Sequence, residues 1–385
     1  MEGFDISKVS EIYVGSSPVS SIYLGSNKLW PAHDYSKDYL TFEAIEDATF
    51  KFTKNSLQYS LDDGSTWTTL AANTATPTVL AGNKILWKQT GLTPSSSGIG
   101  IFSATGNFEA SGNIMSLYYG DGFVGQNNLT GKNYAFRSLF NGNGMLINVK
   151  NLILPATTLS TYCYHQMFYG CSSLTTPPII LPATILSTYC YYQMFANCSS
   201  LTTAPELPAT TLADQCYNSM FASCSALTTA PELPATTLAD SCYFYMFTGC
   251  SSLTTAPELA ATTLAKSCYY AMFGSCSSLT TAPELPATTL ATNCYASMFG
   301  GCSSLTTAPE LPATILTDHC YYYMFSGCSN LNYIKMLATD ISASSCLTGW
   351  VQRVSSTGTL IKSAAMTTLS YGDSGIPGGW TVQNV

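Results

Sequence analysis

The cysteines of this chain form an internal repeat. Seven pairs, each with its second cysteine eight residues after the first, begin at Cys163, and Cys346 follows them alone. The first cysteine of a pair advances by 27 residues once, from Cys163 to Cys190, and by 26 residues at every later step. A period of about 20–50 residues predicts a solenoid or another array of stacked units. Residues 135–159 and 331–346 follow the pattern without all of its cysteines, as expected of end units.

Some positions of the unit never vary, and these positions predict the core. A typical unit reads CYYAMFGSCSSLTTAPELPATTLATN, and both cysteines, the Tyr after the first one and the Met-Phe pair recur in all seven units. An identical residue at one position of every coil stacks on its own copies, which builds a solenoid core. We therefore expect a buried core ladder that includes Cys163, Cys171, Cys190, Cys198, Cys216, Cys224, Cys242, Cys250, Met246 and Phe247.

The unit also predicts its local structure. The segment LTTAPELP allows only short strands, because proline has no N–H to donate to a central strand ladder. The segment CYxxMFxxC predicts one or two helical turns, because the first cysteine, the methionine and the second cysteine lie four residues apart on one helical face.

Packing explains the cysteine columns best, because free cysteine behaves as a small buried hydrophobe. Metal binding is one alternative, but zinc sites use cysteine spacings of about 2–4 residues. Disulfides between adjacent coils are another, but parallel stacking leaves the Cβ atoms further apart than a disulfide prefers. The first residues lack the basic and apolar pattern of a secretory signal peptide. We therefore expect reduced thiols, with no metal and no cofactor.

The rest of the chain predicts β structure, so the fold class is mainly β with short helical turns in a solenoid. The echo of IYVGS in IYLGS, ten residues later, predicts a β-meander at residues 1–34 that serves as an attachment module. Alternating runs between turn clusters predict a β-sandwich-like domain at residues 35–130. The solenoid follows at residues 131–350, and the runs GTLIK and WTVQN predict a terminal hairpin or β cap at residues 351–385.

The segment SLDDGSTW, Ser60–Trp67, matches the Asp-box pattern of sialidases. A sialidase also needs an arginine cluster for the carboxylate of its substrate, and this chain has only Arg137 and Arg353. The motif therefore predicts a structural hairpin turn, in which Asp62 bonds local backbone amides and Gly64 supplies an unusual φ.

Composition excludes several classes of function. Charged residues make up 9% of the chain and the net charge is −8, which argues against a nucleic-acid surface. No apolar run is long enough to span a membrane. No nucleophile-elbow, zinc-protease, P-loop or dinucleotide motif occurs. One carboxylate per coil recurs in five successive units, which predicts a solubilising face, with a cation-binding row or a glycosidase site as alternatives: Glu206, Glu232, Glu258, Glu284 and Glu310.

The repeat MFxGCSSLTTAPELPATTLADSCY resembles the BspA-like leucine-rich repeat, roughly AFxxCxxLxxIxLPxxVxxIxxxAF, over about residues 135–350. Ala-Pro stands where that repeat has a strand isoleucine, which predicts a less regular concave sheet. The segment VSEIYVGSSPVSSIYLGSNKLWP is similar to one at the start of structural proteins of phages and prophages of gut Bacteroides, and the GIPGGWTV end fits the same family. The resemblance implies a virion protein, a head or tail fibre, made in the host bacterial cytoplasm.

Two varying columns predict the binding surface. The residues two and three positions after the first cysteine differ between coils, so we expect them to be exposed and to bind a glycan or a protein. Packing between repeats or an oligomer contact is the alternative. The leading residues are Tyr192, Phe244, Tyr245, Tyr270, Tyr322 and Tyr323.

The resulting hypothesis is a non-enzymatic phage structural protein that forms a homo-oligomer. Its N-terminal region contacts other virion proteins, and its repeats contact a host-surface glycan or protein. A bacterial cell-surface adhesin and a glycoside hydrolase that uses the acidic row are the rival classes.

Overall fold

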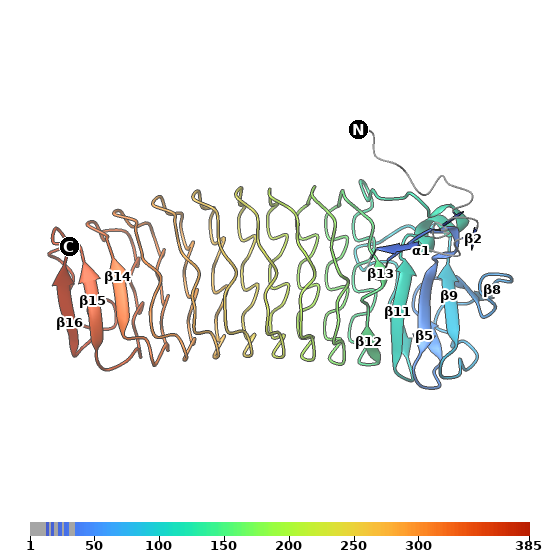
Figure 1. Ribbon diagram of the computed structural model, residues 1–385. Helices are drawn as coiled ribbons and strands as arrows, with labels where there is room; N and C mark the ends of the chain where they lie inside the picture. Colours follow the sequence, from blue (N-terminus) through green and yellow to red (C-terminus); the bar gives the residue numbers. More distant parts are fainter. Residues whose placement is uncertain (1–12, 15–16, 19–21, 25–26, 31–34) are drawn as a thin grey trace.

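The chain folds into an elongated row of coils with a β-domain at one end (Figure 1). This computed structural model describes residues 13–14, 17–18, 22–24, 27–30 and 35–385. In the first part, β1 (Tyr13–Val14) pairs antiparallel with β2 (Ser17–Pro18), and β3 (Ile22–Leu24) pairs antiparallel with β4 (Asn27–Trp30). The rest of the predicted meander lies outside the described residues. Among the described residues, none of the helices has the length and apolar character that crossing a membrane requires.

Two sheets enclose the aromatic core of the N-terminal β-domain. The ring of Phe42 lies 4.9 Å from that of Phe102 and 5.3 Å from that of Phe50, which joins the sheets. The larger sheet has the order β11-β5-β9-β7-β8, and β6 pairs with β10. The bounds are β5 (Leu40–Ala44), β6 (Phe50–Phe52), β7 (Leu57–Ser60), β8 (Thr68–Leu70), β9 (Lys84–Lys88), β10 (Phe102–Ala104) and β11 (Phe108–Asn113). The helical segments are short: η2 (Tyr35–Lys37), α1 (Ser116–Tyr119) and η3 (Gly120–Gly122).

The β-domain and the solenoid share one sheet and one core. Strand β11 pairs parallel with β12 (Leu146–Asn148) and with β13 (Leu152–Ile153), which belong to the first coil. A single cluster of buried apolar side chains runs from Leu40 to Trp380. The hydrophobic core is continuous across residue 130. The predicted boundary between two domains at that residue stays a prediction.

The strand side of the coils is regular only where proline is absent. β14 (Tyr333–Met336), β15 (Gly358–Lys362) and β16 (Trp380–Asn384) form a parallel sheet at the C-terminal end. Middle coils read TTAPEL at the same place, and neighbouring coils there make isolated bridges such as Thr255 with Thr281. The prediction that proline keeps these strands short is confirmed.

The C-terminal residues continue the solenoid. Of the two predicted forms, the terminal hairpin is wrong, and the β cap at residues 351–385 stays a prediction. Thr359 of β15 lies opposite Tyr333 of β14 and Thr381 of β16, and both pairings are parallel. Strands β15 and β16 begin 22 residues apart (380 − 358), close to the coil period, so the chain completes another coil between them.

The segment CYxxMFxxC forms a run of hydrogen-bonded turns rather than an α-helix. Successive backbone N–H groups alternate between a carbonyl acceptor in the same coil and one in the next coil. The Met167 N–H donates to the Tyr164 carbonyl at 3.2 Å, whereas the Phe168 N–H donates to the Met194 carbonyl of the next coil at 2.9 Å. Every fourth residue has a positive φ, such as Gln166 at 54°. A helix has negative φ throughout, so bonds between coils replace those within a helix.

The invariant columns fill the interior of the solenoid. Phenylalanine rings stack from coil to coil, with 5.6 Å between the centroids of Phe221 and Phe247. The second cysteine of each pair donates its thiol to a phenylalanine carbonyl of the preceding coil, as Cys250 does to Phe221 at 3.1 Å. All 15 cysteines are buried and free. The predicted ladder residues are all 0% exposed: Cys163, Cys171, Cys190, Cys198, Cys216, Cys224, Cys242, Cys250, Met246 and Phe247.

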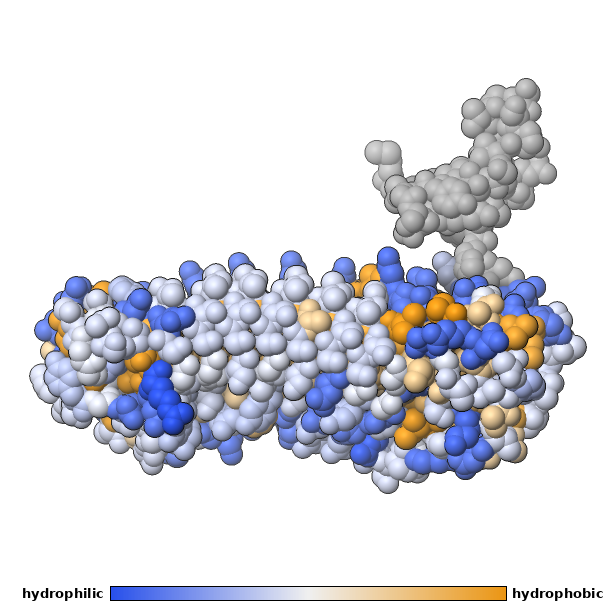
Figure 2. All heavy atoms as spheres, turned by 90° about the horizontal axis from the view of Figure 1, so that it is seen from below, coloured by the Kyte–Doolittle hydropathy of each residue, from blue (hydrophilic) through white to orange (hydrophobic). Residues whose placement is uncertain are grey.

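The surface changes along the solenoid. Figure 2 shows that the middle coils present a nearly uniform face of intermediate hydropathy, and that strongly hydrophobic and strongly hydrophilic residues gather towards the two ends. The uniform part follows from the repeat, which places the same small polar residues in each coil.

Candidate functional site

The predicted binding columns lie on the turn side of the coils. The residue three positions after the first cysteine is left-handed in each of the seven units, for example Tyr245 with φ 55° and Tyr323 with φ 49°. The invariant tyrosine and Met-Phe positions on either side point into the core and are buried. Both variable side chains are partly exposed in three coils, at Tyr192, at Phe244 with Tyr245, and at Tyr322 with Tyr323, whereas small or polar residues at these positions in other coils, such as Asn218 and Ala296, are buried.

The six leading residues are half-buried rather than exposed as predicted. The cause is packing on neighbouring residues, which are rings of the adjacent coil for Tyr192, Phe244 and Tyr270 and the adjoining ring of the same coil for Tyr322 and Tyr323. Phe244 and Tyr270 lie 4.6 Å apart with an interplanar angle of 11°. The half-buried residues are Tyr192, Phe244, Tyr245, Tyr270, Tyr322 and Tyr323.

These residues form separate patches rather than one continuous stripe. Tyr245 packs edge-on against both Phe244 and Tyr270, at 4.5 and 5.5 Å between ring centroids, and these three rings form the middle patch. Tyr322 and Tyr323 lie 4.5 Å apart and form the C-terminal patch. Between these patches the two columns hold Ala296 and Ser297, whose small side chains interrupt the aromatic surface.

A third aromatic patch includes rings that the sequence analysis missed. Tyr134, Tyr162 and Tyr189 stand directly before the first cysteine position of three successive coils, with ring centroids 5.0 and 4.6 Å apart. Tyr192 joins this N-terminal patch edge-on to Tyr189, and it also stacks on His165 at 4.9 Å. The variation of this third column was the signal that could have revealed it.

Comparison with known proteins supplies the family. The sequence profile of the BspA type leucine-rich repeat region matches six copies over residues 145–270 and 244–347, which together span more than half of the chain. The chain belongs to the BspA-type leucine-rich-repeat family. No curated protein and no solved structure matches it.

BspA-type repeats are interaction modules, and this family is typically non-enzymatic. A solenoid of this kind offers an extended rigid surface on which each coil adds its own variable side chains. The aromatic patches of this BspA-type chain fit such use, because they combine large apolar rings with polar tips.

The buried histidine of the N-terminal patch, His165, is uncharged at neutral pH. Burial, assisted by the nearby positive charge of Arg137, lowers the pKa of His165 to about 4. The side chain is 7% exposed, and its Nδ1 atom has no hydrogen-bond partner among the described residues. Within that same part of the chain, no group of three or more His, Cys, Asp or Glu side chains is placed to hold a metal ion.

The acidic row of the BspA-type repeats lies on the strand side, away from the aromatic patches. Its five glutamates are exposed. Glu310 forms an ion pair with Lys335 at 2.9 Å. In the coil before Glu206, Ile180 takes the position that a glutamate takes in the later coils. All five carboxylates lie in water, whereas a catalytic acid and base pair requires one carboxyl group in a contrasting, desolvated environment.

The Asp-box is a structural turn, as predicted. The Asp62 carboxylate accepts the Thr66 N–H at 2.9 Å and the Thr66 hydroxyl at 2.6 Å. These bonds lower the pKa of Asp62 to about 2. Gly64 has φ 84°, and Trp67 Nε1 donates to its carbonyl at 3.1 Å.

Proposed function

We propose that this chain is a non-enzymatic binding protein whose aromatic patches contact a glycan or protein on a bacterial surface, as a head or tail fibre of a phage virion. The patches carry the proposal. Their rings are already held in place by stacking on neighbours, for example Phe244 on Tyr270 at 4.6 Å. Contact with a partner therefore orders few additional side chains, which favours binding.

Two sequence features support the virion part of the proposal. Val9–Pro31 resembles the start of structural proteins of Bacteroides phages, and Gly375–Val382 fits the end of the same proteins. In this proposal the N-terminal region contacts other virion proteins, identical chains associate, and the solenoid projects as an arm.

The test is a double substitution in the C-terminal patch, Tyr322→Ser with Tyr323→Ser. We expect the variant to lose binding to host cells while its melting temperature stays close to that of the wild type, because both side chains are only half-buried. Tyr333→Ser, a half-buried tyrosine on the strand side, is the matched control and keeps its binding. Binding through uncharged rings depends weakly on salt.

Wild-type binding by this variant and by Phe244→Ser with Tyr245→Ser would refute the C-terminal and middle patches as the contact surface. Mass spectrometry of purified particles tests the virion role separately. Absence of the chain from particles, together with its presence on bacterial cells, supports the adhesin instead.

A further inference from the structure

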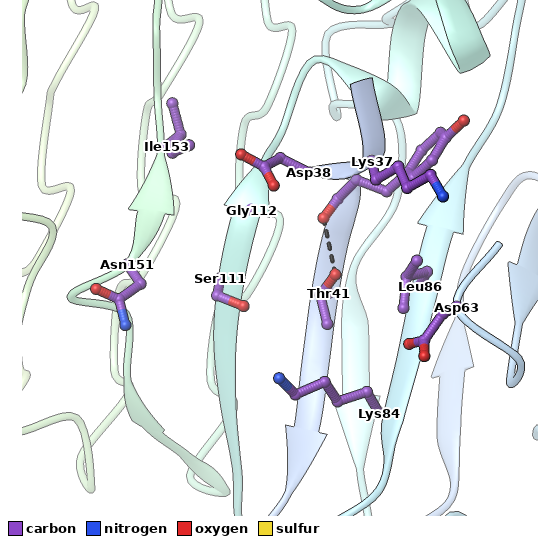
Figure 3. A pocket seen from close by; sticks show the side chains of 11 residues that line it. Lys37, Asp38, Thr41, Asp63, Lys84, Leu86, Ser111, Gly112, Asn151 and Ile153 are labelled. Carbon is purple, nitrogen blue, oxygen red and sulfur yellow. Dashed lines mark hydrogen bonds between the residues drawn. The ribbon is translucent and has the colours of Figure 1, made fainter. Parts of the chain in front are cut away.

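A groove crosses the outer face of the N-terminal sheet beside the first coil (Figure 3). Its volume of about 470 Å³ lies within the range of about 300–1,000 Å³ typical of small-molecule sites. Its floor is formed by β9, β5, β11 and β13, which are successive neighbours in the sheet, and residues 37–39, Asp63 and Asn151 complete the lining. Three strand spacings of about 4.8 Å make the groove about 14 Å long across the strands.

The groove has hydroxyl groups on its two central strands and apolar groups on its two outer strands. Thr41 and Ser111 lie opposite each other on β5 and β11, and Asn151 stands just before β13. Ile153 of β13, which is 37% exposed, supplies apolar surface at one side, and the largely buried Leu86 of β9 supplies less at the other. A pyranose ring has an apolar C–H face and a rim of hydroxyl groups, and this lining matches both.

The charges around the groove balance. Lys37 and Lys84 stand against Asp38 and Asp63, so the lining has no net charge. Lys84 also pairs with Glu43 at 3.4 Å. Asp63 follows Asp62 in the Asp-box and has φ 54°, so the hydrogen bonds that fix this turn also fix a carboxylate at the rim.

The floor of the groove requires a glycine, because two backbone segments approach closely there. Gly112 has φ 74°, and a Cβ atom there would collide with the carbonyl oxygen of Tyr39. At this residue β11 pairs with Leu152 of β13, so the backbone passes closely between the β-domain and the first coil. The groove therefore exists because the two parts share a sheet.

We propose that this groove binds a neutral di- or trisaccharide. Thr41 is paired on both sides, with Leu86 and with Ser111, so no strand edge is open here for an extended peptide to join. A nucleic acid needs an excess of positive charge, and the lining has none. An uncharged ligand rich in hydroxyl groups is the class that the balanced charges and the hydroxyl and amide side chains recognise.

The test is saturation-transfer NMR and calorimetry with a panel of soluble trisaccharides: cellotriose, maltotriose, mannotriose, xylotriose and triacetylchitotriose, with sialyllactose as the charged member. We expect at least one neutral sugar to bind. Ser111→Tyr fills the groove and weakens that binding by at least about tenfold. Glu109→Tyr changes the same strand two residues away, outside the lining, and leaves binding unchanged.

Three outcomes would overturn the proposal: no neutral sugar binds, only sialyllactose binds, or Ser111→Tyr binds as well as the wild type. The site is independent of the aromatic patches. Tyr322→Ser with Tyr323→Ser retains sugar binding in the groove, so a failure of this site and a failure of the proposed function are distinguishable.

Discussion

Replacing Phe247 by alanine tests the physical picture of the solenoid most directly. The ring is fully buried and stacks on Phe221 at 5.6 Å and on Phe273 at 5.7 Å. Truncation of a buried phenylalanine costs about 3–5 kcal/mol. The two stacking contacts supply roughly 1–3 kcal/mol of that cost, at about 0.5–1.5 kcal/mol each.

The loss is expected to stay local, because each coil contacts mainly its two neighbours. Hydrogen exchange followed by mass spectrometry should show faster exchange in residues 216–293, and near wild-type exchange in the N-terminal domain and in the C-terminal coils. Phe244→Ala in the same coil is the control. Its side chain is half-buried, so we expect less than half of the effect. Exchange that accelerates equally over the whole array would refute the nearest-neighbour reasoning.

Three further predictions concern thiols, pH and backbone. Alkylation of the native protein should label few of the 15 cysteines, because burial raises the pKa of thiols such as Cys190 to about 12, whereas denatured protein without reductant should label nearly all of them. As the pH falls from about 6.5 to about 4, the unfolded chain takes up the His165 proton first, so thermal stability decreases over this range and then levels off; His165→Phe should remove that part of the decrease. Gly249 has φ 77°, so Gly249→Val should cost roughly 1–3 kcal/mol in urea melts, whereas Gly249→Asn should cost less, since Asn197 takes this conformation at the equivalent position.

The sequence predicted the core because the core repeats. Met246, Phe247 and the cysteines recur without change, and that sameness reports stacking even when no partner is visible in a single unit. The short strands were predictable for a similar reason, since the proline of TTAPEL excludes a central ladder by its own chemistry.

The turn ladder was not predictable from one unit. Spacings of four residues fit a helical face, but they also fit turns whose every fourth residue is left-handed. The choice depends on bonds such as that from the Phe168 N–H to the Met194 carbonyl, which joins two coils. The parallel arrangement of β15 and β16 was likewise hidden, although their 22-residue offset resembles the coil period.

The candidate sites were also predictable only in part. The aromatic columns were visible as variation, but their half-burial arises from contacts that a single unit does not show, such as the stacking of Tyr270 on Phe244 from the coil before it. The groove left no sequence signal, because it joins Thr41, Ser111 and Asn151, which the chain brings together only when β11 pairs with both the β-domain and the first coil.

The bonding between coils also makes the solenoid adjustable in length. A coil inserted or deleted as a unit of 26 residues leaves every remaining amide with an equivalent partner. Such a change moves the C-terminal patch relative to the N-terminal domain by about one strand spacing, roughly 4.8 Å. Unequal recombination between nearly identical repeats would therefore change the length of the solenoid in equal steps, and the residues at both of its ends would stay the same.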